Sequence, residues 1–342
     1  MNTLEAEKKN IEELTSCPNC GSDDIKQCFE AGDIFYRVTN QLFTLSVCKN
    51  CTLYFLSRRV VPSAIGQYYP FEYGPYNNKA SAPVQVDSGS FLSKIIRAPM
   101  SILNRLVMRV IMPAYRRKLD RISMPAANAK TLLDFGCGSD TFLNRFKQSD
   151  VVTIGMDFTP EVISKVQNSG HVGVLYNGES AWDQLQDSSI DFIRMSHVTE
   201  HLYDPPHVFS KLYQKMKEGG LLHITVPNPE GISARIFGKY FLAFADLPRH
   251  VMLYPLPLLV KLLETKGFEV VESLQEIVTK DIVRSIHIKR NYNNASASTI
   301  HASLHDPGLN QLMFIPMWIS AVFSKSDRYH LLVKKRNSEG SL

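Results

Sequence analysis

The stretch LLDFGCGSD, from Leu132 to Asp140, decides how the rest of this chain is interpreted. Its apolar beginning, followed by Gly136 and Gly138, is typical of a buried strand that runs into a glycine turn. Neither glycine carries a Cβ atom, so the backbone can approach a bound ligand closely. Asp140 stands where a third glycine is usual in such turns. The stretch therefore raises two questions: which ligand the turn holds, and whether the carboxylate of Asp140 obstructs it.

Downstream of this turn, short apolar segments alternate with amphipathic ones. The expected strands are TLLDFG (131–136), VVTIGMD (151–157), VGVLYN (172–177), IDFIRMS (190–196), GLLHITVPN (220–228), GFEVVESL (267–274) and RYHLLVKK (328–335). Helices are expected at FLNRFKQ (142–148) and PEVISKVQNSG (160–170). This alternation is the pattern of a parallel sheet with helices on both faces, so residues 126–342 are predicted to form an α/β domain.

In open α/β sheets, ligands bind at the carboxyl ends of the strands. The turn after the first strand is therefore the expected cofactor site. Asp157 ends the next strand, which is a suitable place to bind ribose hydroxyls.

Two smaller regions precede this domain. Residues 1–60 contain five of the six cysteines, four of them in two CxxC pairs, among short β-like runs. Residues 61–125 begin with the aromatic loop YYPFEYGPY and a polar linker, and they continue into a basic segment with apolar residues at helical spacing. Pro113 is expected to break or kink that helix.

The net charge of +5 is not spread evenly over the 342 residues. Residues 91–121 contain eight basic residues and one acid, which gives them +7 and leaves −2 for everything else. Positive charge confined to one segment argues against a surface that is coated by nucleic acid, and DNA is not expected as a partner.

The four cysteines near the N-terminus form two CxxC pairs. They are Cys17, Cys20, Cys48 and Cys51. Two such pairs offer four thiolates on tight turns, which is the donor set of a closed tetrahedral zinc site. A redox centre would need only one pair. The pattern predicts a zinc-ribbon module that gains folding energy from structural Zn²⁺.

The sequence contains no apolar run long enough to cross a bilayer, and its charged N-terminus lacks the apolar core of a signal peptide. We therefore expect a cytoplasmic protein. The basic segment 91–121 leaves peripheral contact with the inner face of the membrane open, as does the apolar run Leu309–Phe323. The plainer interpretation is that both are helices that cover the sheet or an interface in a homo-oligomer.

An ordered set of motifs after residue 130 adds to this reading. The motifs are LLDFGCGSDTFL, IGMDFTPEVI, DSSIDFIRMSHVTEHLYDP, MKEGGLLHITVPNP and LPRHVMLYPLPLLVKLLETKGFEVV. Together they resemble the class I S-adenosylmethionine-dependent methyltransferases. The resemblance implies a Rossmann-like sheet of seven strands, of which the last is antiparallel.

The resemblance also implies where S-adenosylmethionine binds. Asp134, Gly136 and Gly138 match the loop that holds the methionine end of the cofactor, and Asp157 matches the acid that grips both ribose hydroxyls. We expect Asp140 to cap the following helix and to face the cofactor's ammonium group, so that the turn still binds. A degenerate site that binds no cofactor is the alternative.

Three further residues are implied at this site. Glu179 follows the third strand, where the family usually contacts adenine, and Ser196 and His197 match the end of the fourth strand beside the sulfonium. The zinc ribbon followed by the aromatic loop is similar to a subgroup that methylates sugars in surface-polysaccharide pathways. In that subgroup these two elements help to wall the substrate pocket.

Methyl transfer to a hydroxyl or carbon acceptor needs close positioning and a base. His201 is the candidate base, with Glu200 to orient it or to bind substrate; a capping or packing role for the pair stays open. His250 is a second candidate base, and Arg249 is a candidate to bind a phosphate or carboxylate, against a purely loop-stabilising role. Among the tyrosines of the aromatic loop, Tyr76 is the one predicted to contact the acceptor.

The leading functional hypothesis is therefore methyl transfer to a sugar, either as a small molecule or as a glycan carried by a nucleotide or lipid. A zinc-ribbon methyltransferase of ribosomal RNA is one alternative. It is disfavoured because SHVTEH stands where an Asn-Pro-Pro-Tyr type loop would follow the fourth strand. A non-catalytic scaffold, disabled by Asp140, is another. The acceptor, the methylated atom and the oligomeric state stay open.

Overall fold

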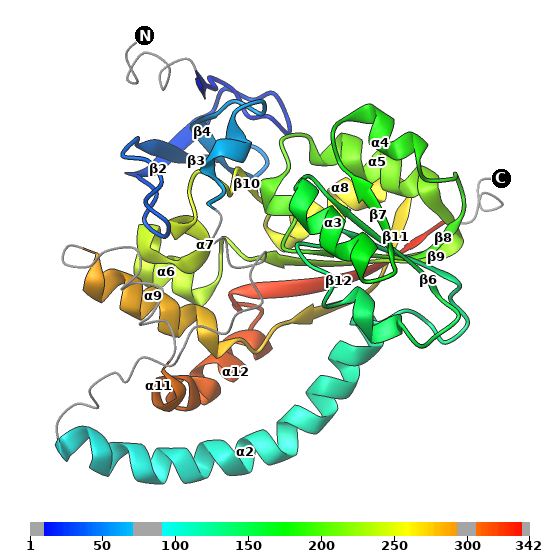
Figure 1. Ribbon diagram of the computed structural model, residues 1–342. Coiled ribbons are helices and arrows are strands. Elements are labelled where there is room, and N and C mark those ends of the chain that lie inside the picture. Colours follow the sequence, from blue (N-terminus) through cyan, green and yellow to red (C-terminus); the bar gives the residue numbers. More distant parts are fainter. Residues whose placement is uncertain (1–9, 71–90, 293–305, 337–342) are drawn as a thin grey trace.

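The computed structural model describes residues 10–70, 91–292 and 306–336, with side chains in the first helix described from Leu106 onward. These residues form a large sheet, a small sheet and a long helix that runs below both (Figure 1).

The large sheet confirms the predicted seven-stranded α/β fold. Its strand order is β11-β12-β9-β8-β5-β6-β7. Five strands are parallel, and β12 pairs antiparallel with both β9 and β11. The strands are β5 Thr131–Phe135, β6 Val152–Asp157, β7 Val172–Leu175, β8 Ile190–Ser196, β9 Met216–Pro227, β11 Phe268–Gln275 and β12 Arg328–Lys335.

The point where the strand order reverses lies between β5 and β8. After β5 the chain adds β6 and β7 on one side, and it then returns to place β8 on the other side of β5. The connections at the carboxyl ends of β5 and β8 therefore diverge, and this is the position at which open α/β sheets form their ligand-binding crevice.

Helices cover both faces of the large sheet, as the sequence predicts. One face packs against α4 (Glu179–Asp183), α5 (Pro205–Lys215) and α8 (Leu256–Thr265). The opposite face packs against α3 (Pro160–Asn168) and the end of α2 through Val162, Val166 and Ile122.

The remaining helical elements lie at the carboxyl ends of the strands and at the lower end of the molecule (Figure 1). They are η1 Ile65–Tyr68, η3 Leu143–Phe146, η4 Thr199–His201, α6 Ile232–Phe237, η5 Gly238–Tyr240, α7 Leu242–Ala245, α9 Thr279–Asn291, α11 Pro307–Leu312 and α12 Phe314–Val322. The expected helix FLNRFKQ is thus only the short 3-10 turn η3.

The small sheet is shared between distant parts of the sequence. Its strands β1 (Ile11–Glu13), β4 (Tyr54–Val60), β3 (Phe43–Cys48) and β2 (Ile25–Ala31) lie in that order. A fifth strand, β10 (Met252–Leu253), pairs antiparallel with β4. The N-terminal sheet is therefore not built from residues 1–60 alone.

Helix α2, Phe91–Ser123, is 33 residues long and continues through Pro113, so the predicted break is wrong. Figure 1 shows it as one curved helix. Its last turns pack on the sheet through Leu119 and Ile122, and it also contacts α11 and α12. Within the described residues, no helix combines the length and apolar character that crossing a membrane requires.

Candidate active site

The glycine turn after β5 has the backbone that its sequence predicts. Gly136 and Gly138 have φ angles of 70° and 60°, in the left-handed region that side chains disfavour. A Cβ atom on Gly136 would lie 2.4 Å from Cγ2 of Val198. The turn therefore needs glycine at Gly136 to pack against the segment that follows β8.

Asp134, inside β5, is fully buried beneath this turn. Its Oδ1 accepts a hydrogen bond from Nη1 of Arg194 at 2.8 Å, while Oδ2 has no partner among the described residues. Burial raises the pKa of this carboxyl, against the lowering effect of Arg194. A buried acceptor without a donor fits a ligand that brings its own N–H groups, as the methionine end of S-adenosylmethionine does.

Asp157, at the end of β6, ties two turns together. Its Oδ2 accepts from the Gly138 N–H at 2.9 Å, and its Oδ1 accepts from the Thr159 N–H at 3.0 Å. Each carboxylate oxygen retains a second lone pair for a ligand hydroxyl. The position fits the predicted ribose-binding acid, because the carboxylate stands beside the glycine turn.

Asp140 is not a helix cap, so that expectation is wrong. The N-cap of η3 is Phe142, without a side-chain hydrogen bond. Oδ2 of Asp140 instead accepts from Oγ of Ser169 at 2.5 Å and from Nδ2 of Asn144 at 2.9 Å. The hydrogen bond from Ser169 is the main cause of the lowered pKa of Asp140. The carboxylate thus ties the turn to the end of α3, and its predicted contact with the cofactor stays a prediction.

Glu179 begins α4 and is exposed. Its carboxylate pairs with Nζ of Lys211 at 2.7 Å and with Nε2 of His207 at 2.6 Å, both on α5, and these partners lower its pKa. In the structure the partners of Glu179 are thus side chains of α5, and its contact with adenine stays a prediction. Ser196 ends β8 and is half-buried.

His197 lies directly after β8 in a left-handed conformation with a φ of 56°, which is uncommon for a residue with a side chain. Its Nδ1 lies 3.2 Å from Oε1 of Glu200, and its Nε2 lies 3.3 Å from Nη1 of Arg328. Because a guanidinium can only donate, Nε2 accepts and Nδ1 donates to the carboxylate. Arg328 is in turn held by both oxygens of Asp281.

Glu200 is buried in η4 and keeps its negative charge. Burial alone would raise its pKa, but the hydrogen bond from His197 and the nearby His201 and His250 hold it at about 2. Its Oε2 has no partner within the described part of the chain. The ligand atoms of Glu200, His201 and His250 all lie within 4.8 Å of one another, which is close enough to surround one metal ion.

His201, the predicted base, has a fixed orientation, and no described residue forms a hydrogen bond with its Nε2. Its Nδ1 lies 2.9 Å from the Arg249 carbonyl oxygen and 3.0 Å from the Tyr69 hydroxyl. We assign the proton to Nδ1, since a carbonyl can only accept, and this leaves the lone pair on Nε2. Burial and the neighbouring His250 lower the pKa of His201 to about 4, so the imidazole is neutral at pH 7.

Tyr69 is a residue of the described part of the aromatic loop that lies beside the candidate base. Its ring also packs edge-on against Phe158, which follows β6. Tyr69 therefore lies between the cofactor edge of the sheet and His201. Tyr76 lies outside the described residues.

His250 lies beside His201, with ring centroids 4.8 Å apart. It is buried, and its Nδ1 donates to the Ala243 carbonyl at 2.6 Å. Its Nε2 lies 3.4 Å from Oδ2 of Asp246. His250 thus has partners for both nitrogens and packs against the candidate base.

Arg249 is not available to a phosphate or carboxylate ligand, so that expectation is wrong. It is fully buried and donates from Nη2 to Asp33 at 2.7 Å and from Nε to Asp246 at 2.6 Å. Its guanidinium also stacks over the Tyr36 ring at 4.6 Å. Arg249 therefore fastens the loop before β10 to the N-terminal region, a role that no local sequence pattern indicates.

Backbone hydrogen bonds complete this connection. The Val251 N–H donates to the Glu200 carbonyl at 2.8 Å, and the Leu56 N–H donates to the Val251 carbonyl at 3.0 Å. The 3-10 turn that carries the candidate base is therefore linked through one residue to strand β4 of the small sheet.

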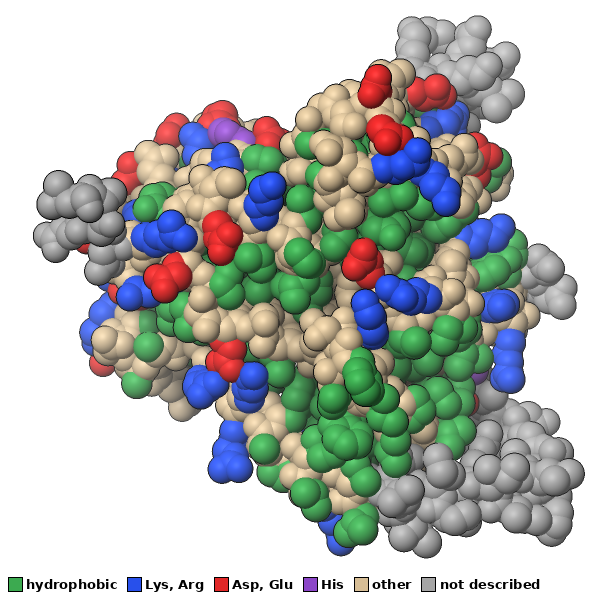
Figure 2. Space-filling model, turned by 180° about the vertical axis from the view of Figure 1, so that it is seen from behind, with side chains coloured by type: hydrophobic (Ala, Val, Ile, Leu, Met, Phe, Trp, Pro, Cys, Tyr) green, Lys and Arg blue, Asp and Glu red, His purple; other side chains and the backbone are tan. Residues whose placement is uncertain are grey.

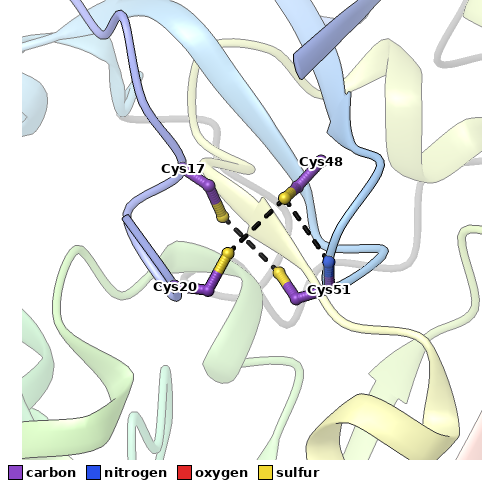
Figure 3. A group of neighbouring side chains, drawn as sticks. All are labelled: Cys17, Cys20, Cys48 and Cys51. Atoms are coloured by element: carbon purple, nitrogen blue, oxygen red, sulfur yellow. Dashed lines mark hydrogen bonds between the residues drawn. The ribbon is translucent and has the colours of Figure 1, made fainter. Parts of the chain in front are cut away.

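The four predicted zinc ligands converge, as Figure 3 shows. Sγ of Cys17 lies 3.5 Å from Sγ of Cys51, and Sγ of Cys20 lies 3.6 Å from Sγ of Cys48. A ZnS₄ tetrahedron with Zn–S distances of about 2.3 Å has edges of about 3.8 Å. The cluster therefore fits Zn²⁺ after a very small expansion.

Comparison with known proteins agrees with this geometry. Residues 108–273 match the model of a family described as a methyltransferase domain. A protein of Mycolicibacterium smegmatis, named as a probable S-adenosylmethionine-dependent methyltransferase, is 27% identical over 145 residues, which are 42% of this chain and 54% of that protein. The chain therefore spans about half the length of this curated relative.

Two solved structures illustrate the similarity. A SAM-dependent methyltransferase of Archaeoglobus fulgidus aligns with a TM-score of 0.42 at 19% identity, over 68% of this chain and 94% of that one. A cyclopropane synthase of Mycobacterium tuberculosis aligns with a TM-score of 0.42 at 16% identity, over 64% and 83%. Residues 108–273 thus match a methyltransferase domain, and the seven-stranded sheet has the Rossmann-like α/β fold that such a domain is expected to have.

Proposed function

We propose that this chain transfers a methyl group from S-adenosylmethionine to a hydroxylated acceptor, namely a sugar carried by a nucleotide or a lipid, with His201 as the general base. The methyltransferase-domain match over residues 108–273 supports methyl transfer. The observation that carries the proposal is the fixed tautomer of His201, whose Nδ1 is held by the Arg249 carbonyl beside the Tyr69 hydroxyl.

On the cofactor side, the proposal uses the two acids that the glycine turn brings together. Asp134 offers its unpaired Oδ2 to the methionine end, and Asp157 offers its remaining lone pairs to the ribose. When bound, S-adenosylmethionine supplies an electrophilic methyl group on a positively charged sulfur. Ser196 and His197, at the end of β8, border the place where that sulfur is expected.

On the acceptor side, Nε2 of His201 takes the proton of the attacking hydroxyl. Burial and His250 disfavour the imidazolium that results, and the adjacent Glu200, whose pKa of about 2 keeps it ionised, offsets part of that cost. Tyr69 can hydrogen-bond the acceptor, and aromatic rings together with hydroxyl and imidazole groups suit a polyhydroxylated substrate. This supports a sugar acceptor, in agreement with the resemblance of the N-terminal half.

Zinc completes the proposal as a structural element. Cys17, Cys20, Cys48 and Cys51 would hold Zn²⁺ as a closed site that cross-links the small sheet. Because β10 and Arg249 join that sheet to the loop of His250, the ion would support the acceptor side from a distance.

The test is a methyl-transfer assay with labelled S-adenosylmethionine against nucleotide-sugar, lipid-linked glycan and RNA pools. Transfer to RNA alone would contradict the sugar acceptor, and no calorimetric binding of millimolar cofactor would contradict methyl transfer itself.

The role of His201 is tested with two variants. His201→Ala should lower turnover by at least about a hundredfold, while cofactor affinity stays within about threefold. His201→Gln keeps a donor for the Arg249 carbonyl but cannot accept a proton at neutral pH, so it should be as inactive as the alanine variant. Recovery of activity in His201→Gln would show a packing role instead.

The pH profile gives an independent check. Because burial lowers the pKa of His201 to about 4, the base stays unprotonated well below the usual value of about 6.5. kcat/KM should therefore be level from pH 7 to about pH 5 and fall below that. A fall centred near pH 6.5 would contradict this assignment.

A further inference from the structure

The most exposed apolar side chains of the described residues gather on two helices. Four large hydrophobic residues are more than 60% exposed: Leu106 and Val110 in α2, Val322 at the end of α12, and Phe323 directly after it. Two of them, Val110 and Phe323, are 72% exposed. Helices α2 and α12 contact each other and lie together at the lower end of the molecule (Figure 1).

Helix α12 has no charged residue between Phe314 and Val322. Its inner side is buried through Phe314, Met317 and Ser320, which follow each other at three-residue intervals. Its other side is left to solvent, with Ile319 45% exposed. The apolar side chains on this side of α12 are therefore exposed to solvent, and exposed apolar patches of this kind are common at interaction sites.

The outer side of α2 combines apolar and basic residues. Leu106, Arg109, Val110, Ala114 and Arg117 occupy positions i, i+3, i+4, i+8 and i+11 and are all exposed, so they lie on one side of the helix. Figure 2 shows hydrophobic side chains gathered over the lower part of the rear face, with Lys and Arg beside them.

The same helix borders a basic hollow near its end. An open depression of about 350 Å³ is lined by Ala114, Arg117, Lys118 and Arg121. Lys118 and Arg121 reach Glu272 on β11 at 3.0 Å and 2.7 Å, so one carboxylate faces several cations. The hollow keeps a net positive charge and suits an anionic group such as a phosphate.

The positive charge and the exposed apolar residues together discriminate between three possible partners of α2 and α12: a second copy of the chain, a nucleic acid and an anionic bilayer. A second copy of the chain, related by twofold symmetry, would place two segments of +7 against each other, which is unfavourable. A nucleic acid would use the basic residues but would leave the exposed Val322 and Phe323 in water. An anionic bilayer surface accepts both, because its headgroups attract cations and its acyl boundary takes up apolar side chains.

We propose that α2 and α12 form a docking face for the surface of an anionic lipid bilayer. The apolar residues Leu106, Val110, Val322 and Phe323 insert at the acyl boundary, and Arg109, Arg117 and the hollow bind lipid phosphates. The proposal does not depend on methyl transfer, since it concerns a surface away from the crevice between β5 and β8.

The test is sedimentation of the full-length protein with phosphatidylcholine vesicles that either contain or lack phosphatidylglycerol. Binding is expected only to the anionic vesicles and should weaken in high salt. Arg109→Ala/Arg117→Ala should weaken binding about 25-fold, or about fivefold for each charge removed. Val322→Ser/Phe323→Ser should weaken it at least about tenfold.

Matched controls remove the same groups elsewhere. Lys165→Ala/Lys261→Ala removes two exposed charges from α3 and α8, and Val152→Ser/Val172→Ser removes two side chains that are 52% and 50% exposed at β6 and β7. Both controls should bind anionic vesicles within about threefold of the unchanged protein.

Three results would overturn the proposal. One is equal sedimentation with both kinds of vesicle. Another is no vesicle binding together with a dimer that Val322→Ser/Phe323→Ser converts to a monomer, which would assign the face to a second copy. The third is binding to an RNA homopolymer with no binding to anionic vesicles.

Discussion

The two sides of the crevice are built in different ways. The proposed cofactor side consists of turns that directly follow β5, β6 and β8, and Asp157 joins two of them through hydrogen bonds to backbone N–H groups. The proposed acceptor side joins Tyr69, His201 and the Arg249 loop, which are held together across two sheets. One side is organised by neighbouring strands, and the other by contacts between segments far apart in the sequence.

This difference predicts that the two sides respond differently to substitutions in the small sheet and in the glycine turn. A change in the small sheet should disturb the acceptor side and spare the cofactor side, because only the former is fastened to Asp33 and β4. A change in the glycine turn should disturb the cofactor side and spare the acceptor side.

The largest effect is expected from loss of the proposed zinc ion. Cys48→Ser removes one of four ligands at a site of a kind that contributes about 10–16 kcal/mol in isolated zinc modules. Turnover should fall to background, while cofactor affinity measured by calorimetry changes less than about threefold. Cys28→Ser is the matched control, since Cys28 is exposed and outside the cluster. An equal loss of cofactor binding in Cys48→Ser would contradict the distinction between the two sides.

Arg249→Met should have the next largest effect. It leaves Asp33 and Asp246 without their buried cation, and breaking such a pair costs about 3–5 kcal/mol of the free energy of unfolding. Urea denaturation measures this cost. Arg235→Met, on an exposed helix position, should stay within about 0.5 kcal/mol. If both variants unfold alike, Arg249 does not fasten the two sheets.

Asp157→Asn tests the cofactor side. The amide cannot accept from both Gly138 and Thr159 at once, and hydrogen bonds to a charged group contribute about 1.5–3 kcal/mol. Cofactor affinity should fall about ten- to a hundredfold, as calorimetry would report, while zinc content stays the same. Unchanged affinity would exclude Asp157 from the cofactor site.

The smallest effect is expected from Asp140→Ala. The variant loses the hydrogen bonds from Ser169 and Asn144, at a cost of about 1 kcal/mol of stability, and it leaves the crevice unchanged. Thermal denaturation measures the loss of stability, and calorimetry measures the cofactor affinity. A cofactor affinity that falls by tenfold or more would instead support the predicted contact of Asp140 with the cofactor.

Patterns within single segments were sufficient to predict much of the structure. The strand–helix alternation after residue 130 predicts the seven-stranded sheet, and the CxxC spacing predicts the cysteine cluster. The first prediction rests on the periodicity of strands and helices, and the second rests on the tight turn within each CxxC pair. Residues that are close together in the sequence determine both features.

Contacts between distant segments were not predictable in the same way. Asp33 and Arg249 are separated by 216 positions, so nothing near Arg249 indicates that it is buried and paired. Tyr69 and Tyr76 share one aromatic loop, and only the packing of η4 against the turn after η1 identifies Tyr69 as the partner of His201. Asp140 resembles a helix cap until Ser169 is seen to donate to it.

The shared small sheet also has a consequence for synthesis on the ribosome. Strand β10 follows the last cysteine of the cluster by about 200 residues, which take on the order of 10–40 s to translate. During that interval β4 has an open edge where β10 will later pair, although all four thiols have already emerged. Early metal capture would protect the thiols of the nascent N-terminal segment from oxidation while β4 waits for its last strand.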